Sequence, residues 1–118
     1  MGTRRQSTPS GRTILVVDDH LEALTALRGT LERAGHRVLI AESPASALAL
    51  LEVEPIQLVL TSFFLPGMAG EELIQRIRER EPLVQIVVHA GGPAPRPPLE
   101  VLRRLAIQGY YDWDESPE

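Results

Sequence analysis

The sequence predicts a single α/β domain built on a parallel sheet, with helices packed on both faces of the sheet. The main observation is that short, continuous apolar runs alternate with longer segments whose apolar residues recur every three or four positions. The runs show no alternation of polar and apolar residues, which is typical of strands buried on both faces. The chain has 118 residues, enough for one domain with its own core, and no cysteine that could form a disulfide.

The first half of the domain follows this alternation closely. Ile14–Val17 predicts the first strand, and Leu21–Ala34 predicts a helix because leucines line one of its faces. Val38–Ala41 predicts the second strand. Ser43 is a favourable N-cap for a second helix that starts with a proline and runs over residues 44–54.

The second half of the domain predicts three more strands and two more helices. In chain order these are the strand Leu58–Thr61, the helix Gly70–Arg80, the strand Val84–Val88, the helix Leu99–Ile107 and the short strand Tyr110–Trp113. Residues 91–98 contain four prolines and two glycines, which predicts an irregular loop before the last helix. The polar residues 1–12 predict a flexible tail, so the folded domain is expected to span residues 13–118.

Composition and charge exclude several classes of function. No apolar run approaches the roughly 18 residues of a membrane span, and residues 1–12 lack the apolar core of a secretory signal. The formal net charge of −4 argues against nucleic acid as the main partner. All 12 basic residues are arginine, so any mechanism that needs a lysine ammonium is excluded.

Candidate functional residues stand where the predicted strands end. In open parallel sheets, ligands bind at the carboxyl ends of the strands. Asp18 and Asp19 follow the first strand, Ser62 follows the third and His89 follows the fourth. The stretch Tyr111–Asp114 occupies the same place on the fifth. These residues are therefore expected to form the site.

The strand ends resemble those of response regulator receiver domains. Ile14–Asp19 (ILVVDD) looks like the first strand of that family, and Leu58–Gly70 (LVLTSFFLPGMAG) is similar to its third strand and following loop. Ile86–Ala90 and the pair at 109–110 fit the fourth and fifth strands. The resemblance implies a doubly wound, flavodoxin-like receiver fold with a five-stranded parallel sheet in the order 2-1-3-4-5. It also implies a fifth helix, which this sequence does not include.

The resemblance implies a phosphoryl-transfer site that has lost most of its chemical groups. In the family, two acidic residues hold Mg²⁺, a third aspartate accepts a phosphoryl group from a phosphohistidine, and a Thr or Ser and a Lys bind the phosphoryl oxygens. Asp18 and Asp19 match the acidic pair. Ser62 stands in place of the phospho-accepting aspartate, and His89 replaces the Thr or Ser.

The family's lysine has no counterpart in this chain. If Gly109 and Tyr110 set the alignment, Trp113 takes its place; if Pro117 sets it, Ser116 does. The better fit of the Gly-Tyr pair favours Trp113. Tyr110 and Trp113 are then switch positions, and clustered aromatic residues on this strand could anchor a partner.

We therefore expect a degenerate receiver, or pseudo-receiver: a non-catalytic, cytoplasmic signalling module of a bacterial phosphorelay that works independently of aspartyl phosphorylation. Its partner would be a kinase, an output domain or a second copy of the chain, and neither nucleic acid nor a membrane. Asp18 and Asp19 would bind Mg²⁺ weakly at most, and no other cofactor is expected. Two alternatives stay open. One is a metal-dependent phosphohydrolase using the two aspartates with His89, and the other is a switch triggered by Ser62 phosphorylation or His89 protonation.

Three finer expectations complete this interpretation. His89 should approach Asp18 or Asp19 and have a raised pKa. His20 and His36 are expected at the surface, with no metal role for His20. Without a fifth helix, part of the sheet face beside the first helix would stay bare, so this form of the chain is expected to self-associate or to lose stability.

Overall fold

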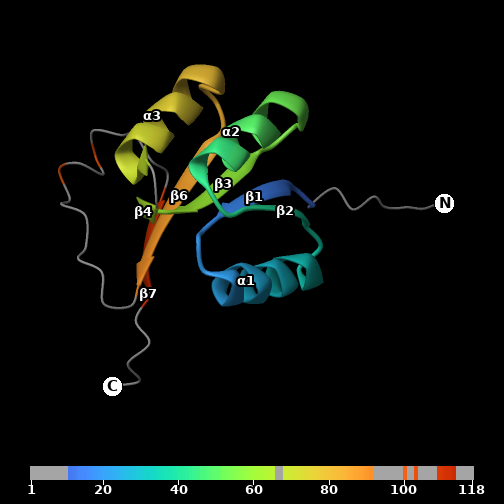
Figure 1. Ribbon diagram of the computed structural model, residues 1–118. Coiled ribbons are helices and arrows are strands. Elements are labelled where there is room, and N and C mark those ends of the chain that lie inside the picture. Colours follow the sequence, from blue (N-terminus) through green and yellow to red (C-terminus); the bar gives the residue numbers. More distant parts are fainter. Residues whose placement is uncertain (1–10, 66–67, 92–99, 101–102, 104–108, 114–118) are drawn as a thin grey trace.

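The computed structural model describes residues 11–65, 68–91, 100, 103 and 109–113 (Figure 1). Its elements follow one another as β1 (Thr13–Val17), α1 (Leu21–Arg33), β2 (Arg37–Ala41), α2 (Pro44–Val53), β3 (Leu58–Ser62), β4 (Phe64–Leu65), β5 (Met68–Ala69), α3 (Gly70–Arg80), β6 (Gln85–Gly91) and β7 (Gly109–Trp113). The predicted tail lies almost wholly outside the described residues. So does the predicted helix 99–107, of which only Glu100 and Arg103 are described, both as helical.

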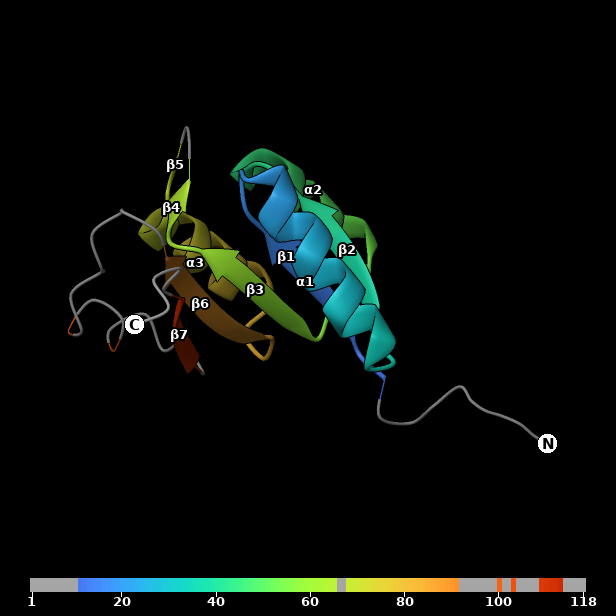
Figure 2. The same ribbon diagram turned by 90° about the horizontal axis from the view of Figure 1, so that it is seen from below.

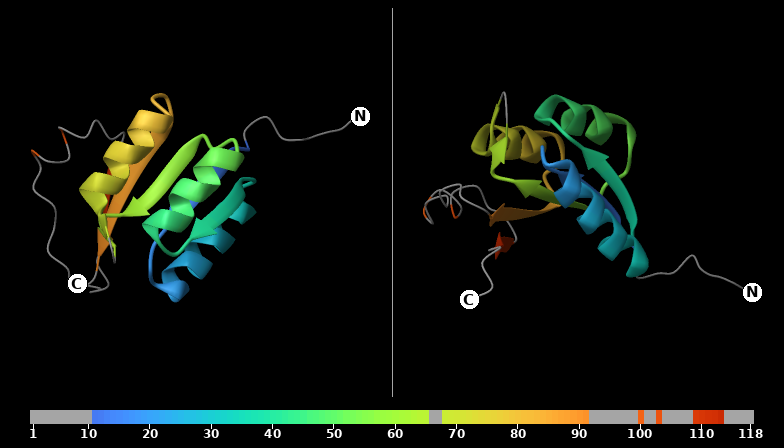
Figure 3. Two further views of the ribbon diagram at one scale, coloured as in Figure 1. Left: turned by 45° about the horizontal axis from the view of Figure 1, so that its top comes forward. Right: turned by 60° about the horizontal axis from the view of Figure 1, so that its bottom comes forward.

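Five parallel strands form the main sheet in the order β2-β1-β3-β6-β7. Counted along the chain without the short β4 and β5, this is the predicted order 2-1-3-4-5. The helices α2 and α3 lie side by side on one face, and α1 lies on the other (Figures 1 and 3). The predicted doubly wound α/β class is confirmed.

Local signals in the sequence account for the helix ends. The Ser43 side chain accepts a hydrogen bond from the backbone N–H of Ser46 at 3.2 Å, and Pro44 opens α2 as predicted. Gly35 follows α1 with a φ of 97°, a left-handed conformation that glycine adopts without the steric cost of a side chain.

The antiparallel hairpin of β4 and β5 was not predicted. Phe64 pairs with Ala69 and Leu65 with Met68. Strands of two residues are too short to carry a periodic pattern, so only the Pro-Gly pair between them marks a turn in the sequence. Figure 2 shows the hairpin projecting from the tip of β3, beside the carboxyl edge of the main sheet.

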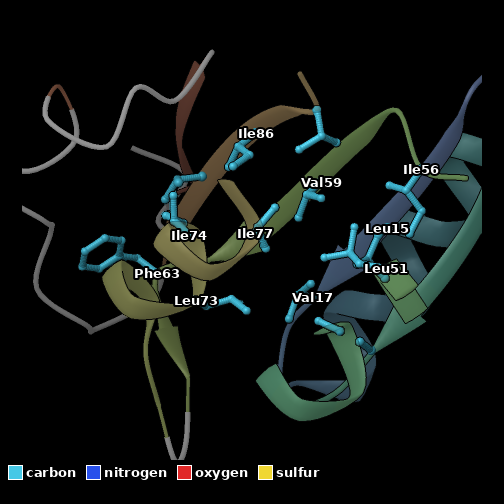
Figure 4. Packing of buried hydrophobic residues seen from close by; sticks show 14 residues of the cluster. Leu15, Val17, Leu51, Ile56, Val59, Phe63, Leu73, Ile74, Ile77 and Ile86 are labelled. Carbon is cyan, nitrogen blue, oxygen red and sulfur yellow. The ribbon is translucent and has the colours of Figure 1, made fainter. Parts of the chain in front are cut away.

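The core has two layers because β1 is buried on both faces. Leu15 and Val17 point to the side of α2 and α3, whereas Ile14 and Val16 point to α1. Fourteen buried residues form the cluster under α2 and α3 (Figure 4). The cluster under α1 contains Ile14, Val16, Leu24 and Val38, with Leu27, Leu31, Ile40, Leu58 and Leu60 partly buried around it. Within the described residues, the α1 side is thus the less completely covered face.

Among the described residues, no helix has both the length and the apolar character needed to cross a membrane.

Two glycines at helical positions provide a matched test of packing. A Cβ at Gly70 would lie 1.9 Å from the carbonyl oxygen of Phe63, a backbone atom that cannot move aside cheaply. A Cβ at Gly29, inside α1, meets only the flexible end of Arg33 at 3.2 Å. We expect Gly70→Ala to lower the free energy of unfolding by about 1–3 kcal/mol or more. Gly29→Ala should raise it by roughly 0.5–1 kcal/mol. Urea denaturation followed by circular dichroism measures both, and an unchanged midpoint for Gly70→Ala would contradict the packing described.

Candidate functional site

The carboxyl ends of three neighbouring strands bring the predicted site residues together. Val17, the last residue of β1, pairs with Thr61, and Ser62 at the end of β3 pairs with His89 of β6. Asp18 follows β1 directly, and its backbone N–H donates to the carbonyl of Ala41 at 3.1 Å. The backbone of the site is therefore fixed by the sheet itself.

The Asp18 carboxylate is buried and lies between two histidines. Its side chain is 5% exposed. One oxygen, Oδ1, lies 3.1 Å from His20 Nδ1 and accepts the His20 backbone N–H at 3.0 Å. The other oxygen, Oδ2, lies 3.4 Å from His89 Nε2. The predicted approach of His89 to Asp18 is thus confirmed.

His20 contacts both aspartates, which the sequence analysis did not foresee. It is exposed, as predicted, but its Nδ1 also lies 3.1 Å from Oδ1 of Asp19, which is exposed as well. Side-chain ligand atoms of Asp18, Asp19 and His20 all lie within 4.8 Å of one another. The only signal in the sequence was that His20 directly follows the two aspartates. His36, the other histidine expected at the surface, is half-buried and accepts the Arg12 backbone N–H at 3.1 Å, away from this site.

The two histidines respond oppositely to their surroundings. A hydrogen bond to Asp18, together with the charges of Asp19 and Asp18, raises the pKa of His20 above its ordinary 6.5. Burial lowers the pKa of His89, and the Asp18 charge opposes this without reversing it. The predicted rise for His89 was wrong because desolvation of the ring outweighs the attraction of a single carboxylate. His89 Nε2 is buried and has no hydrogen-bond partner in the described part of the chain.

The remaining predicted site residues lie along the same edge. Ser62 is half-buried at the end of β3, and its carbonyl accepts the Thr61 hydroxyl at 2.9 Å. In β7, Tyr110 pairs with Val88 and the last residue, Trp113, pairs with Gly91. The side chains of Tyr110 and Trp113 lie outside the described residues, so their switch roles stay predictions. The other candidate for the lysine place, Ser116, also lies outside them.

The donor set at this edge includes two carboxylates that could hold Mg²⁺ together with waters. That ion prefers oxygen ligands in near-octahedral geometry. The described edge offers the carboxylates of Asp18 and Asp19, a neutral hydroxyl at Ser62, and an imidazole nitrogen in contact with both carboxylates. No third carboxylate stands beside Asp18 and Asp19 in that cluster of described residues.

Comparison with known proteins agrees with this architecture. A family model described as the response regulator receiver domain matches residues 14–97. The virulence sensor protein BvgS of Bordetella pertussis is 44% identical over 68 residues, which are 58% of this chain and 6% of BvgS. The chain thus spans a small part of the length of that relative.

Solved structures show the same fold. A CheY-like receiver domain protein from Methanospirillum hungatei is 28% identical with a TM-score of 0.79, covering 87% of this chain and 82% of that one. The response regulator TrrA of Thermotoga maritima, solved in complex with Mg²⁺ and BeF, is 25% identical with a TM-score of 0.76, covering 89% of each chain.

The opposite shifts of the two histidines predict their titration. In a metal-free sample with EDTA, NMR of the imidazole rings should give a pKa above 6.5 for His20 and below 6.5 for His89. Asp18→Asn should lower both values, because it removes a charge that raises each of them. Glu22→Gln, an exposed acid in the first turn of α1, is the control and should change neither. A rise of the His89 pKa in Asp18→Asn would contradict the geometry.

The free energy of unfolding should depend on pH in the way that these two pKa shifts require. The contribution of His20 is present below pH 6.5 and is lost as the pH rises through its folded-state pKa. His89 acts in the opposite sense: its lowered pKa costs stability as the pH falls from 6.5 through the folded-state value. In Asp18→Asn the stabilisation by His20 should shrink and the cost from His89 should grow, and urea midpoints measured across this pH range check both changes.

Proposed function

Because the chain belongs to the response regulator receiver domain family, we propose that it is a two-component signalling module that works through protein contacts and without aspartyl phosphorylation. The observation that carries this proposal is Ser62. It lies at the end of β3, in register with His89, at the place that the resemblance assigns to the phospho-accepting aspartate.

The chemistry of Ser62 supports this proposal. A serine hydroxyl is neutral at pH 7, so it offers neither a carboxylate nucleophile nor a third negative charge for Mg²⁺. The chain has no lysine that could bind phosphoryl oxygens. The half-buried imidazole of His89 takes the place of the small hydroxyl that the family uses beside the phosphoryl group.

Receiver domains act together with kinases and output domains, and we propose a partner of that kind, or a second copy of this chain, for the present protein. The net charge of −4 supports a protein partner and not nucleic acid. We place the module in the cytoplasm, away from the membrane, as is usual for the family.

The direct test is whether the protein responds to a phosphoryl donor or to a phosphoryl analogue. With Mg²⁺ and either acetyl phosphate or beryllofluoride, the amide NMR spectrum should stay unchanged, because Ser62 supplies no carboxylate. Ser62→Asp restores the third carboxylate and should respond to beryllofluoride with Mg²⁺, whereas the uncharged Ser62→Asn should not. Shifts around Ser62 and His89 in the unmodified protein would overturn the proposal.

The alternatives from the sequence analysis are checked separately. A phosphohydrolase would release nitrophenol from 4-nitrophenyl phosphate with Mg²⁺ or Mn²⁺, and its rate would fall in Asp18→Asn. Phosphorylation of Ser62 as a trigger would require a phosphorylated form in the cell, which intact-mass measurement detects. Neither alternative has an observation in its favour beyond the presence of Asp18, Ser62 and His89 at one edge.

Self-association through the α1 side of the sheet stays a prediction. Leu60 is only partly buried on that side. Sedimentation at micromolar concentrations should show a dimer, and Leu60→Glu should shift it to a monomer. Leu83, which is 94% exposed on the connection between α3 and β6, provides the control, since Leu83→Glu should leave the dimer intact. A monomeric unmodified chain would end this idea.

A further inference from the structure

We propose that His36 is a pH-sensitive clasp, which fixes the start of β1 while its imidazole ring is neutral and releases it when the ring is protonated. The clasp lies at the amino edge of the sheet, at the opposite end of the strands from Asp18 and Ser62 (Figure 2). The inference is independent of the proposed function, because it concerns neither phosphoryl chemistry nor a protein partner.

Two side chains hold the residues that lead into β1. The backbone N–H of Arg12 donates to Nδ1 of His36 at 3.1 Å, and His36 directly precedes β2. The backbone N–H of Thr13 donates to Oε1 of Gln57 at 2.7 Å, and Gln57 directly precedes β3. Because β1 lies between β2 and β3 in the sheet, each neighbouring strand supplies one of these two acceptors.

Only one of the two acceptors changes with pH. The amide oxygen of Gln57 accepts a hydrogen bond throughout the range in which proteins fold, because a side-chain amide carries no ionisable proton there. An imidazole Nδ1 accepts only while the ring is neutral with its proton on Nε2, since both nitrogens of a protonated ring are donors. His36 is half-buried, so solvent can reach its ring. Protonation would therefore break the contact with Arg12 and leave the contact with Thr13 intact.

The charged groups around His36 offer a protonated ring no anionic partner. They come from the residue before β1, from β2 and from the neighbouring ends of α1 and α2: Arg12, Arg37, Glu32, Arg33 and Glu54. Both carboxylates are already paired, Glu32 with Arg28 at 3.2 Å and Glu54 with Arg37 at 3.1 Å. Among the described residues, no carboxylate forms an ion pair with His36. Protonation would thus add a cation beside arginines as well as remove the acceptor.

The clasp decides which residue is the first one fixed to the sheet. Residues 1–11 join the fold through Arg12, whose carbonyl also accepts the Arg37 backbone N–H at 2.9 Å. While His36 is neutral, Arg12 therefore extends the contact of β1 with β2 by one residue. When His36 is protonated, this extension loses its N–H contact. Thr13, bound to Gln57 through both its N–H and its carbonyl, then becomes the first fixed residue.

The test follows hydrogen exchange of the Arg12 and Thr13 amides by NMR on the whole chain, between about pH 5 and 8, where histidine ordinarily changes its charge. Each exchange rate is divided by that of an unstructured peptide at the same pH. At about pH 8, imidazole NMR should show the proton of the His36 ring on Nε2. As this ring is protonated, the protection of the Arg12 amide should fall about fivefold, as expected for the loss of one hydrogen bond. The Thr13 amide is the internal control and should keep its protection.

Two variants separate the charge of the ring from the presence of an acceptor. His36→Asn keeps an acceptor near the place of Nδ1 but cannot be protonated, so the Arg12 amide should stay protected at every pH. His36→Phe removes the acceptor and should lower the protection of that amide by about fivefold throughout. Circular dichroism checks that each variant is folded, and His36→Asn decides the matter if His36→Phe is not.

Three results would overturn the inference. The first is an Arg12 amide whose protection does not change as the His36 ring is protonated, and the second is the same pH dependence in His36→Asn. The third is an equal loss of protection at Arg12 and Thr13, which would show a general loosening of the fold. A response of the unmodified protein to beryllofluoride would contradict the proposed function and leave the clasp standing, so the two proposals fail separately.

Discussion

The buried carboxylate of Asp18 is the constraint on which the carboxyl edge of the sheet depends. Removing such a charge from water costs on the order of several kcal/mol unless polar partners replace the lost hydration. Asp18 cannot turn away, because β1 is buried on both faces and its backbone N–H is bound to Ala41. The His20 backbone and imidazole meet one oxygen, and His89 from β6 meets the other. The Asp18 carboxylate therefore contacts both the connection from β1 to α1 and the end of β6.

The sheet could be predicted from the sequence because its strands are continuous apolar runs. Leu15 and Val17 belong to one core layer and Ile14 and Val16 to the other, so neither face of β1 could be polar. Apolar runs do not predict the hairpin after β3, because its strands are only two residues long. The strand order was predicted from the resemblance to receiver domains and not from the apolar runs themselves.

The site was only partly predictable, for a different reason. That Asp18, Ser62 and His89 would gather at one edge follows from parallel topology alone. The position of His20 depends on the turn after β1, which places its ring against both aspartates. The spacing of apolar residues in the sequence does not predict such a turn. The sign of the His89 pKa shift depends on how deeply the ring is buried, which the identity of the residue does not reveal.

The two histidines of the site differ in how far they are exposed to solvent. The His89 side chain is 13% exposed, whereas those of His20 and Asp19 are 78% and 36% exposed. The Oδ2 oxygen of Asp18 faces His89 of β6, whereas Oδ1 faces His20. Asp18 thus connects the exposed His20 with the central strand β6 through its two carboxylate oxygens.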